Sequence, residues 1–372
     1  MSTVKYPLLP YSLSVWNRLK KYGDAEYLLE RISWNPQLLS SDKVMQALRS
    51  ALLAHPIFWA EFDDEGKHYP GKCENVLNGP FHQVKTGEGE GDAYAEIRVN
   101  RLLGDGISRL IFAEDFCRAL AGLPIEPDNY WEYLESIQNH KHSPSYLQHG
   151  VELKDEFCKI DYPLAPKEDT DLPQRNADGI IQVDLAIFQE QVIDFIDSWK
   201  LSLNGLMILS SAMAIMDMEN SDKAGMTWAY DGRETEQEQR IFGSLHRDVP
   251  ICIMRAEIKD MIRQTRTALR RGIAHSDYPF TLTSPADSPW HKAVNVVVEP
   301  AWDNAKNQLP EGLHIEDDYT WSAMSYLDVE VFENPLRMQL RYDAACYTEQ
   351  RIAEFAQQIK ENVRKILDFH GK

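Results

Sequence analysis

The segment at residues 99–108 reads Val99-Asn100-Arg101-Leu102-Leu103-Gly104-Asp105-Gly106-Ile107-Ser108. It follows Tyr94–Val99, a strand candidate, and leads into Ile107–Leu120, which reads as a helix. Gly104 and Gly106 interrupt the regular structure, and Asp105 stands between them at the helix start, where a carboxylate can cap free backbone N–H groups. The segment therefore predicts a strand, a turn and a helix in immediate succession.

Strands and helices alternate on both sides of this segment. Before it, Ser41 is a plausible N-cap for a helix that Pro56 ends, and Ile57–Phe62 is predicted as a strand. After it, Asn129–His142 is predicted as a helix. A second series of strands is predicted at Ile180–Val183, Ala224–Tyr230, Val249–Met254, Ala293–Val298, Met324–Phe332 and Leu336–Tyr342. Its helices are predicted at Leu185–Trp199, at Ser202–Met218 and in a final helix with Ile352, Phe355, Ile359, Val363 and Ile366 on one face.

Residues 159–179 separate the two series, because they contain three prolines, many charges and few apolar side chains. A chain of 372 residues is long enough for two domains. We therefore expect an α/β lobe at residues 1–158, a linker or crossover at 159–179 and a second α/β lobe at 180–372.

The formal net charge of the chain is −19. This charge disfavours nucleic acid and anionic membrane surfaces as partners, because both are bound by clustered cations. The most apolar stretch, Leu203–Met218, is shorter than the ~20 residues that span a bilayer, so it is predicted to be a buried core helix. The first ten residues lack the pattern of a signal peptide, and we expect a cytoplasmic protein.

The sequence predicts neither disulfides nor a metal site. The five cysteines lie far apart and form no C-x-x-C pair. His140, His142 and His149 have no acidic or cysteine ligand at a suitable spacing, so they are interpreted as surface histidines. Gly87–Gly91 alternates glycine with glutamate, which would repel a phosphate, and is predicted to be a flexible surface loop.

Residues 100–108 resemble the His-His-x-x-x-Asp-Gly-x-Ser motif of nonribosomal peptide synthetase condensation domains and related acyltransferases. Other segments resemble further motifs of that family, in the expected order over nearly the whole chain. These are Ser12–Trp16 (the opening motif), Ala54–Phe62 (R-H-x-x-L-R-x-x-F), Tyr130–Tyr133 (Y-x-D-[FY]), Gly232-Arg233 with Ile241–Leu245 and Val249-Pro250 (G-R and I-G-x-F-V-N-T-x-P), and His275–Phe280 ([HN]-Q-D-Y-P-F).

The resemblance implies a mixed α/β fold of two chloramphenicol-acetyltransferase-like lobes, arranged as a V-shaped pseudo-dimer with sheets flanked by helices. It implies a stand-alone acyltransferase of nonribosomal peptide or acyl-conjugate biosynthesis, such as antibiotic biosynthesis. An acyl or peptidyl carrier protein would deliver a phosphopantetheine thioester, and a small amine would accept the acyl group. The resemblance implies no bound cofactor and no metal.

The chain departs from the family at the two histidines, which are matched here by Asn100 and Arg101. The family's second histidine assists attack of the amine on the thioester. Arginine stays protonated and cannot serve as a base, and losing a positioned base typically costs about 10²–10⁴ in rate. A free α-amine, with a pKa near about 8, is partly unprotonated at neutral pH. Amide formation could therefore survive by positioning, with Arg101 stabilising the oxyanion.

The resemblance implies mainly structural roles for the other motif residues. The family's aspartate, matched by Asp105, is largely structural and pairs with an arginine, for which Arg233 is one candidate. Gly106 and Ser108 complete the motif, and Gly232 with Arg233 would shape a tunnel between the lobes.

His275 is the nearest candidate for a replacement base, although its motif supports the fold in the family. His55 and His246 have similar or weaker claims. The candidate catalytic set is therefore Asn100, Arg101, Asp105 and Gly106, with His275 as a weaker member.

Two functions remain open. The first is an acyltransferase that joins a carrier-bound acyl group to an amine. The second is a catalytically silent module that binds a carrier protein or recruits a tailoring enzyme, as some condensation-like domains without this histidine do. Arg101 separates them, because a side chain that fills the tunnel favours the second function and one that lines an open tunnel favours the first.

Overall fold

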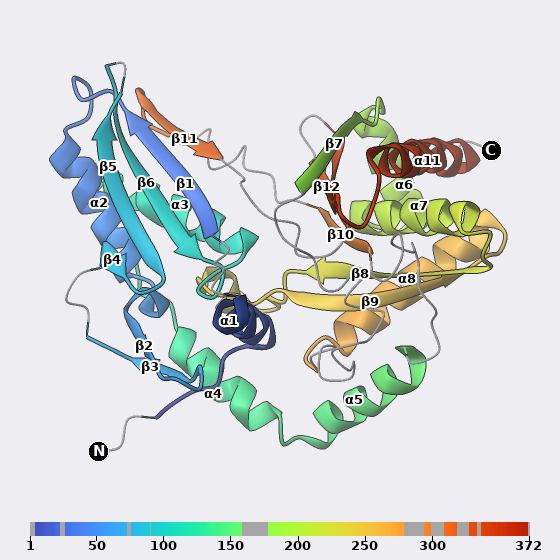
Figure 1. Cartoon of the computed structure of the whole chain (residues 1–372), viewed down its shortest axis with the longest axis horizontal. Helices are drawn as coiled ribbons and strands as arrows, with labels where there is room; N and C mark the ends of the chain where they lie inside the picture. Colours follow the sequence, from blue (N-terminus) through green and yellow to red (C-terminus); the bar gives the residue numbers. More distant parts are fainter. Residues whose placement is uncertain are drawn as a thin grey trace. The chain divides into compact units, whose positions relative to one another are not determined.

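The computed structural model describes residues 4–22, 27–72, 76–89, 91–157, 178–278, 294–298, 309–317, 327–332 and 336–370 (Figure 1). The chain folds into two compact units, each assembled from separate stretches of sequence. The first contains Met1–His142, Asp231–His246 and Trp302–Trp321, and the second contains Ser143–Tyr230, Arg247–Ala301 and Ser322–Lys372. Two segments from the C-terminal half thus belong to the first unit. The expected linker at 159–179 falls almost entirely outside the described residues.

The first unit is built on an antiparallel five-stranded sheet in the order β11-β1-β6-β5-β4. Its strands are β1 (Tyr27–Trp34), β4 (Asn78–Gly79), β5 (His82–Glu88), β6 (Ala93–Asn100) and β11 (Leu313–Asp317). The helices of this unit are α1 (Pro10–Tyr22), α2 (Ser41–Leu53), α3 (Gly106–Leu120) and α4 (Tyr130–His140), and a small hairpin pairs β2 (Ala60–Phe62) with β3 (His68–Pro70). Helices α2 and α3 pack against each other behind the sheet (Figure 1). Ile32, Leu48 and Phe116 are buried in the resulting core.

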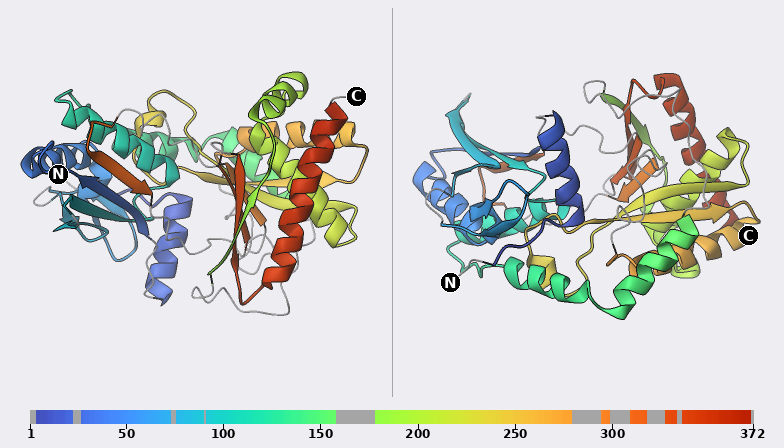
Figure 2. Two further views of the ribbon diagram at one scale, coloured as in Figure 1. Left: turned by 90° about the horizontal axis from the view of Figure 1, so that it is seen from above. Right: turned by 60° about the horizontal axis from the view of Figure 1, so that its bottom comes forward.

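The second unit contains a mixed six-stranded sheet in the order β7-β13-β12-β10-β8-β9. Its strands are β7 (Asp178–Asp184), β8 (Lys223–Tyr230), β9 (Arg247–Met254), β10 (Val294–Val298), β12 (Leu327–Phe332) and β13 (Arg337–Asp343). Strand β10 is parallel to both of its neighbours, and the other pairs are antiparallel. The helices of this unit are α5 (Pro144–Phe157), α6 (Gln189–Trp199), α7 (Leu203–Met218), α8 (Ile258–Ala274) and α11 (Glu349–His370). Helices α7, α8 and α11 pack together against this sheet (Figure 2).

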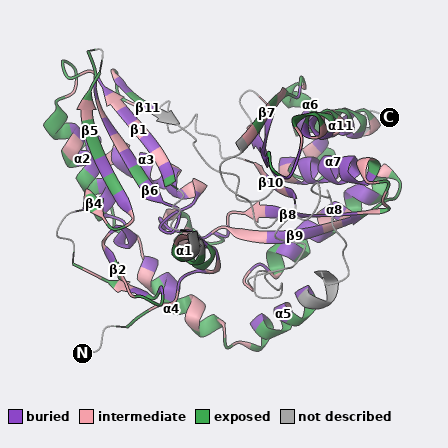
Figure 3. Ribbon diagram, viewed as in Figure 1, coloured by how far each residue is buried: buried purple, intermediate pink, exposed green. Residues whose placement is uncertain are grey.

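Helix α7 is the buried core helix that its composition predicted. All residues from Leu206 to Met216 are buried, and Figure 3 draws the helix largely in purple. Ser202 begins it by accepting a hydrogen bond from the N–H of Gly205. Within the described residues, no single helix is long and apolar enough to cross a membrane, and the pair α6 and α7, which together reach that length, is bent by 93°.

Several predicted boundaries were wrong for local reasons. The cap of α2 is Ser40 rather than Ser41, because the Ser40 side chain accepts from the N–H of Lys43. Pro56 begins a short 3₁₀ helix, so the strand predicted at Ile57–Phe62 is confined to β2.

Two further boundaries differ. Helix α6 begins at Gln189 rather than Leu185, since Ala186 has a left-handed φ of 51° and its N–H donates to the side chain of Asp184. Gly87 lies in β5 rather than in a loop, and Gly91, with a φ of 96°, occupies the turn between β5 and β6.

Candidate functional site

The motif segment lies where β6 ends and α3 begins. Asn100 is the last residue of β6 and is 1% exposed. Its side-chain oxygen accepts a hydrogen bond from the backbone N–H of Leu102 at 2.8 Å. The Asn100 side chain therefore serves the turn itself, in which it fixes the backbone that leads from the strand to the helix.

Arg101 follows Asn100 in the motif turn and is buried. It is 5% exposed, and its guanidinium lies over the ring of Tyr11, 5.6 Å from the centroid. Tyr11 belongs to α1, and the hydroxyl of the next residue, Ser12, donates to the carbonyl of Leu102 at 3.0 Å. A cation over an aromatic face is favourable, more so away from water. These contacts join α1 to the motif turn.

Asp105 caps helix α3, as the sequence predicted. The backbone N–H of Ser108 donates to the Asp105 carboxylate at 2.9 Å, and the N–H of Asp105 donates to the Ser108 hydroxyl at 3.1 Å. This reciprocal capping box satisfies donors that the first helical turn would otherwise leave open. Gly106 follows as the first residue of the helix.

Arg233 reaches Asp105 from 128 residues further along the chain. Both terminal nitrogens of its guanidinium lie 3.1 Å from carboxylate oxygens of Asp105, and the Arg233 side chain is 0% exposed. The same guanidinium donates to Asp231 at 2.6 Å and to the carbonyl of Gly243 at 2.9 Å. The structure thus brings together the two residues that the resemblance proposed as a pair, in the two-pronged geometry that suits arginine.

The carboxylate of Asp105 is fully engaged by the protein. Five N–H groups donate to it, from Ser108, from two nitrogens of Arg233, and from the backbone of Leu245 and His246. Burial by itself raises the pKa of Asp105, but the charge of Arg233 and these hydrogen bonds outweigh burial and lower the pKa to about 2. The arrangement makes Asp105 a structural anion rather than a proton carrier.

Segment Asp231–His246 is held against the motif by close backbone contact as well as by charge. The N–H of Gly243 donates to the Ser108 hydroxyl at 3.1 Å. A Cβ atom on Gly104 would lie 2.7 Å from the ring of Phe242, so this approach requires a glycine. Gly232 has a φ of 76°, a conformation that glycine adopts without strain. The glycines thus allow the segment to lie directly on the turn.

His246 is a neighbour of Arg101 through the same aromatic ring. The His246 and Tyr11 ring centroids lie 3.9 Å apart. Burial lowers the pKa of His246 to about 4, and the positive charges of Arg101 and Arg233 contribute, whereas Asp105 opposes them. The imidazole is therefore neutral at pH 7 and a weak base.

A second buried network surrounds His55, and its other members were not predicted from the sequence. The Nδ1 of His55 lies 2.8 Å from Asp128 and its Nε2 lies 3.5 Å from Asp115, while His55 itself is 1% exposed. Arg240 reaches Asp115 at 3.2 Å, and the N–H of Phe242 donates to Asp128 at 3.1 Å. Through these two carboxylates His55 helps to anchor the segment Asp231–His246 to the rest of the first unit, which is a structural role.

His275 belongs to the second unit, where it ends helix α8. Its Nε2 lies 3.2 Å from Glu152, and its ring stacks on that of His149 at 4.6 Å. His149 in turn lies 2.7 Å from Asp277. Burial, followed by the neighbouring His149, lowers the pKa of His275. These contacts fasten α5 to the end of α8, and the His149 side chain is 22% exposed. Pro279 and Phe280 of this motif lie outside the described residues.

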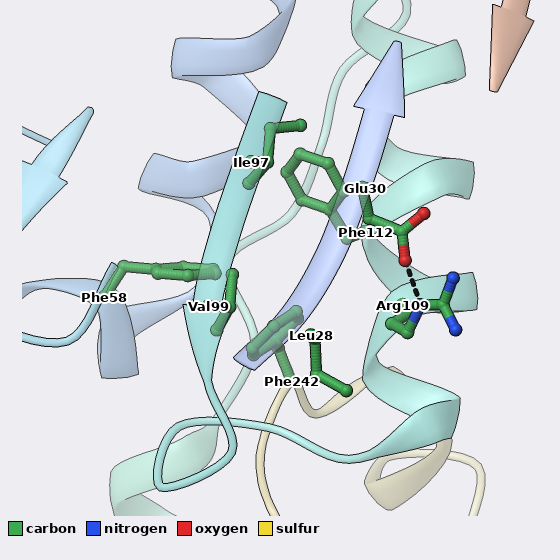
Figure 4. A pocket seen from close by; sticks show the side chains of 8 residues that line it. All are labelled: Leu28, Glu30, Phe58, Ile97, Val99, Arg109, Phe112 and Phe242. Carbon is green, nitrogen blue, oxygen red and sulfur yellow. Dashed lines mark hydrogen bonds and ion pairs between the residues drawn. The ribbon is translucent and has the colours of Figure 1, made fainter. Parts of the chain in front are cut away.

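A small cavity opens behind the motif within the first unit (Figure 4). It has room for about one water molecule. Leu28, Phe58, Ile97, Val99, Phe112 and Phe242 supply its apolar wall, and the buried ion pair of Glu30 with Arg109 lies at its edge. The cavity is too small for an acyl chain. Within the described part of the chain, no three His, Cys, Asp or Glu side chains meet in a way that could hold a metal ion.

The family model of the condensation domain matches residues 97–369 of the chain. The chain belongs to the condensation-domain family. The matched range includes the motif turn from Asn100 to Ser108, as well as Arg233 and His275. The match thus includes the motif turn and the network of hydrogen bonds around Asp105.

Solved structures support the same fold over the whole chain. The X-domain from teicoplanin biosynthesis has a TM-score of 0.80 and 13% identity, covering 100% of this chain and 97% of that one. The epimerization domain from the third module of tyrocidine synthetase B has a TM-score of 0.78 and 15% identity, covering 99% of each chain. The starter condensation domain of rhizomide synthetase RzmA has a TM-score of 0.76 and 13% identity, covering 98% and 96%.

Identities this low establish the fold alone, and these three neighbours differ in their stated roles. A comparison with curated protein sequences gave no match. The two-lobed condensation-domain fold expected from the resemblance is confirmed. The roles of the individual site residues rest on the geometry described above.

Proposed function

We propose that this condensation-domain protein has lost the amide-forming step and works by binding, either to an acyl or peptidyl carrier protein or to a partner enzyme. The observation that carries this proposal is the state of Arg101. At the position of the family's second histidine stands a guanidinium that is 5% exposed and packed on Tyr11. Such a group has no free lone pair with which to take a proton from an amine.

Neighbouring groups offer a poor replacement for the missing base. His246 shares the ring of Tyr11 with Arg101, but its pKa is lowered to about 4. Efficient general bases titrate near the working pH, so this imidazole would accept a proton weakly. Asp105 is saturated by N–H donors, and the Asn100 side chain is used within the turn. The family's chemistry therefore lacks its proton acceptor, while the framework around it persists.

The binding role draws support from the intact framework and from a structural neighbour. The pair of Asp105 and Arg233 holds the first unit together whether or not chemistry occurs there. An X-domain has been solved in complex with OxyB from teicoplanin biosynthesis, and that X-domain has a TM-score of 0.75 to this chain. A condensation fold can therefore serve as a binding platform. A carrier protein would present its acyl group on a phosphopantetheine arm, with no metal required.

Residual amide formation is the competing function, and one observation favours it. The buried charge of Arg101 could stabilise the oxyanion of a thioester if a substrate reached it. In that case activity would favour amines over alcohols, because an amine near neutral pH is partly unprotonated whereas an alcohol must lose its proton during attack.

A condensation assay read by intact-protein mass spectrometry tests the proposal. Acyl-loaded carrier proteins and small amines are incubated with the wild type, with Arg101→Ala and without protein. We expect acyl transfer at the protein-free background in every case, together with measurable binding of a carrier or partner enzyme. Transfer well above background by the wild type, lowered by Arg101→Ala, would overturn the proposal in favour of the enzyme.

A further inference from the structure

A row of basic side chains follows one face of helix α8. Lys259, Arg263, Arg266 and Arg270 recur at intervals of four, three and four residues, which aligns them along the helix. Lys259, Arg263 and Arg270 are exposed, and Arg266 is half-buried. We call these four residues the basic stripe. With a rise of 1.5 Å per residue, the stripe is about 16 Å long.

The stability of the helix does not explain the basic stripe. Like charges three and four residues apart repel one another on a helix surface. Lys259 lies in the first turn, where the positive end of the helix dipole disfavours a cation. The helix carries five basic residues and one acidic residue, Asp260, which pairs with Arg263 at 3.0 Å. This one ion pair within the helix offsets only part of the repulsion among the four cations, so the stripe remains an electrostatic cost to α8.

The opposite face of α8 holds the helix in place. Met261, Ile262, Ala268 and Leu269 are buried in the core of the second unit, and α8 packs on β9 and α7. Arg266 has a structural contact of its own, since it donates to the carbonyl of Trp199 at 3.2 Å. The three exposed members of the stripe can therefore be changed without disturbing the core.

We propose that the basic stripe is a docking surface for a protein that presents a row of carboxylates, such as an acidic helix. The whole chain has a net charge of −19, so a cluster of cations on one helix face is a local exception that an acidic partner can recognise. An extended polyanion or an anionic membrane would meet repulsion beyond the stripe, whereas a small acidic face can match about 16 Å of it. The identity of the partner as a bound protein rests on the proposed function.

The test measures binding of two probes by fluorescence anisotropy at low and high salt. One probe is an apo acyl carrier protein, and the other is a synthetic helical peptide with glutamate at intervals of four, three and four residues. The triple variant Lys259→Glu, Arg263→Glu and Arg270→Glu reverses the exposed stripe. The control, Arg364→Glu with Lys365→Glu, reverses two exposed charges on α11 in the same unit. Circular dichroism checks that each variant folds.

We expect the stripe variant to bind at least one probe about tenfold more weakly than the wild type, with a flatter salt dependence, and the control to stay within about twofold. If both variants bound the probes equally weakly, the effect would come from the net charge of the protein rather than from the stripe, and the proposal would be overturned. Equal binding by the wild type and the stripe variant would also overturn it, as would no binding of either probe by the wild type. None of these outcomes depends on acyl transfer, so the proposed loss of catalysis is judged separately by its own assay.

Discussion

Replacing Asp105 with alanine is expected to destabilise the first unit by about 3–5 kcal/mol, the usual cost of removing one partner from a buried ion pair. The change leaves the guanidinium of Arg233, which is 0% exposed, with Asp231 as its acidic partner. It also removes the N-cap of α3, worth about 1 kcal/mol, and the acceptor for the N–H groups of Leu245 and His246.

The lowered pKa of Asp105 reports a part of this contribution, the preference of the folded protein for the ionised carboxylate over the protonated one. A fall from the ordinary 3.8 to about 2 corresponds to roughly 2–3 kcal/mol of stability. Because the pKa of this acid is lowered by folding, that stability is fully present above about pH 4 and is lost as the pH falls toward 2. The variant should lack this part of the acid dependence.

The assay is urea unfolding followed by circular dichroism at pH 7, repeated between about pH 2 and pH 5. The matched control is Asp217→Ala, which removes an exposed aspartate that lies 2.8 Å from Arg255. An exposed pair of this kind contributes about 0–1 kcal/mol, so the control should unfold close to the wild type. The reasoning is refuted if Asp105→Ala also unfolds within about 1 kcal/mol of the wild type and retains its acid dependence.

Three further predictions concern the same unit. Gly232→Ala should cost about 1 kcal/mol in urea unfolding, because the residue has a φ of 76°, and an unchanged midpoint would contradict this account. His55→Ala should cost about 2 kcal/mol or more in the same assay, because it leaves the buried carboxylates of Asp115 and Asp128 without their shared imidazole, and wild-type stability would count against a structural role. The His246 imidazole, followed by NMR, should titrate near pH 4. Because unfolding raises its pKa to the ordinary 6.5, the stability that comes from a neutral His246 is present at pH 7 and is lost as the pH falls below 6.5. A titration midpoint near 6.5 in the folded protein would show that the ring is not buried as described.

The local structure around the motif could be predicted because its signals are local. Strand β6, the turn and helix α3 were predicted with nearly correct ends from a strand pattern, from the two glycines around Asp105 and from the apolar run that follows them. The partner of Asp105 was found in another way, since the family resemblance suggested an arginine and Gly232-Arg233 was the matching pair. Backbone propensity thus predicted the motif turn, and the order of the family motifs predicted the pairing of Asp105 with Arg233.

The remaining networks could not be predicted, because their members are far apart in the sequence. Arg240 pairs with Asp115 across 125 residues, and His149 pairs with Asp277 across 128. No spacing rule connects such residues before the fold brings them together. The same holds for Arg101, because its packing on Tyr11 depends on how the fold places α1 beside the motif turn.

The most direct test of the central claim compares acyl transfer by the wild type with transfer by Arg101→His, which restores an imidazole at the family's second histidine position. Intact-protein mass spectrometry would follow an acyl-loaded carrier protein and an amine, and an unchanged melting temperature would serve as the control for folding. The account predicts that acyl transfer by the wild type stays at the protein-free background. Transfer by the variant should exceed that background by up to about 10²–10⁴-fold, the rate increase that a positioned base supplies. Transfer by the wild type that equals or exceeds that of the variant would contradict the claim that Arg101 marks a reaction that has been lost.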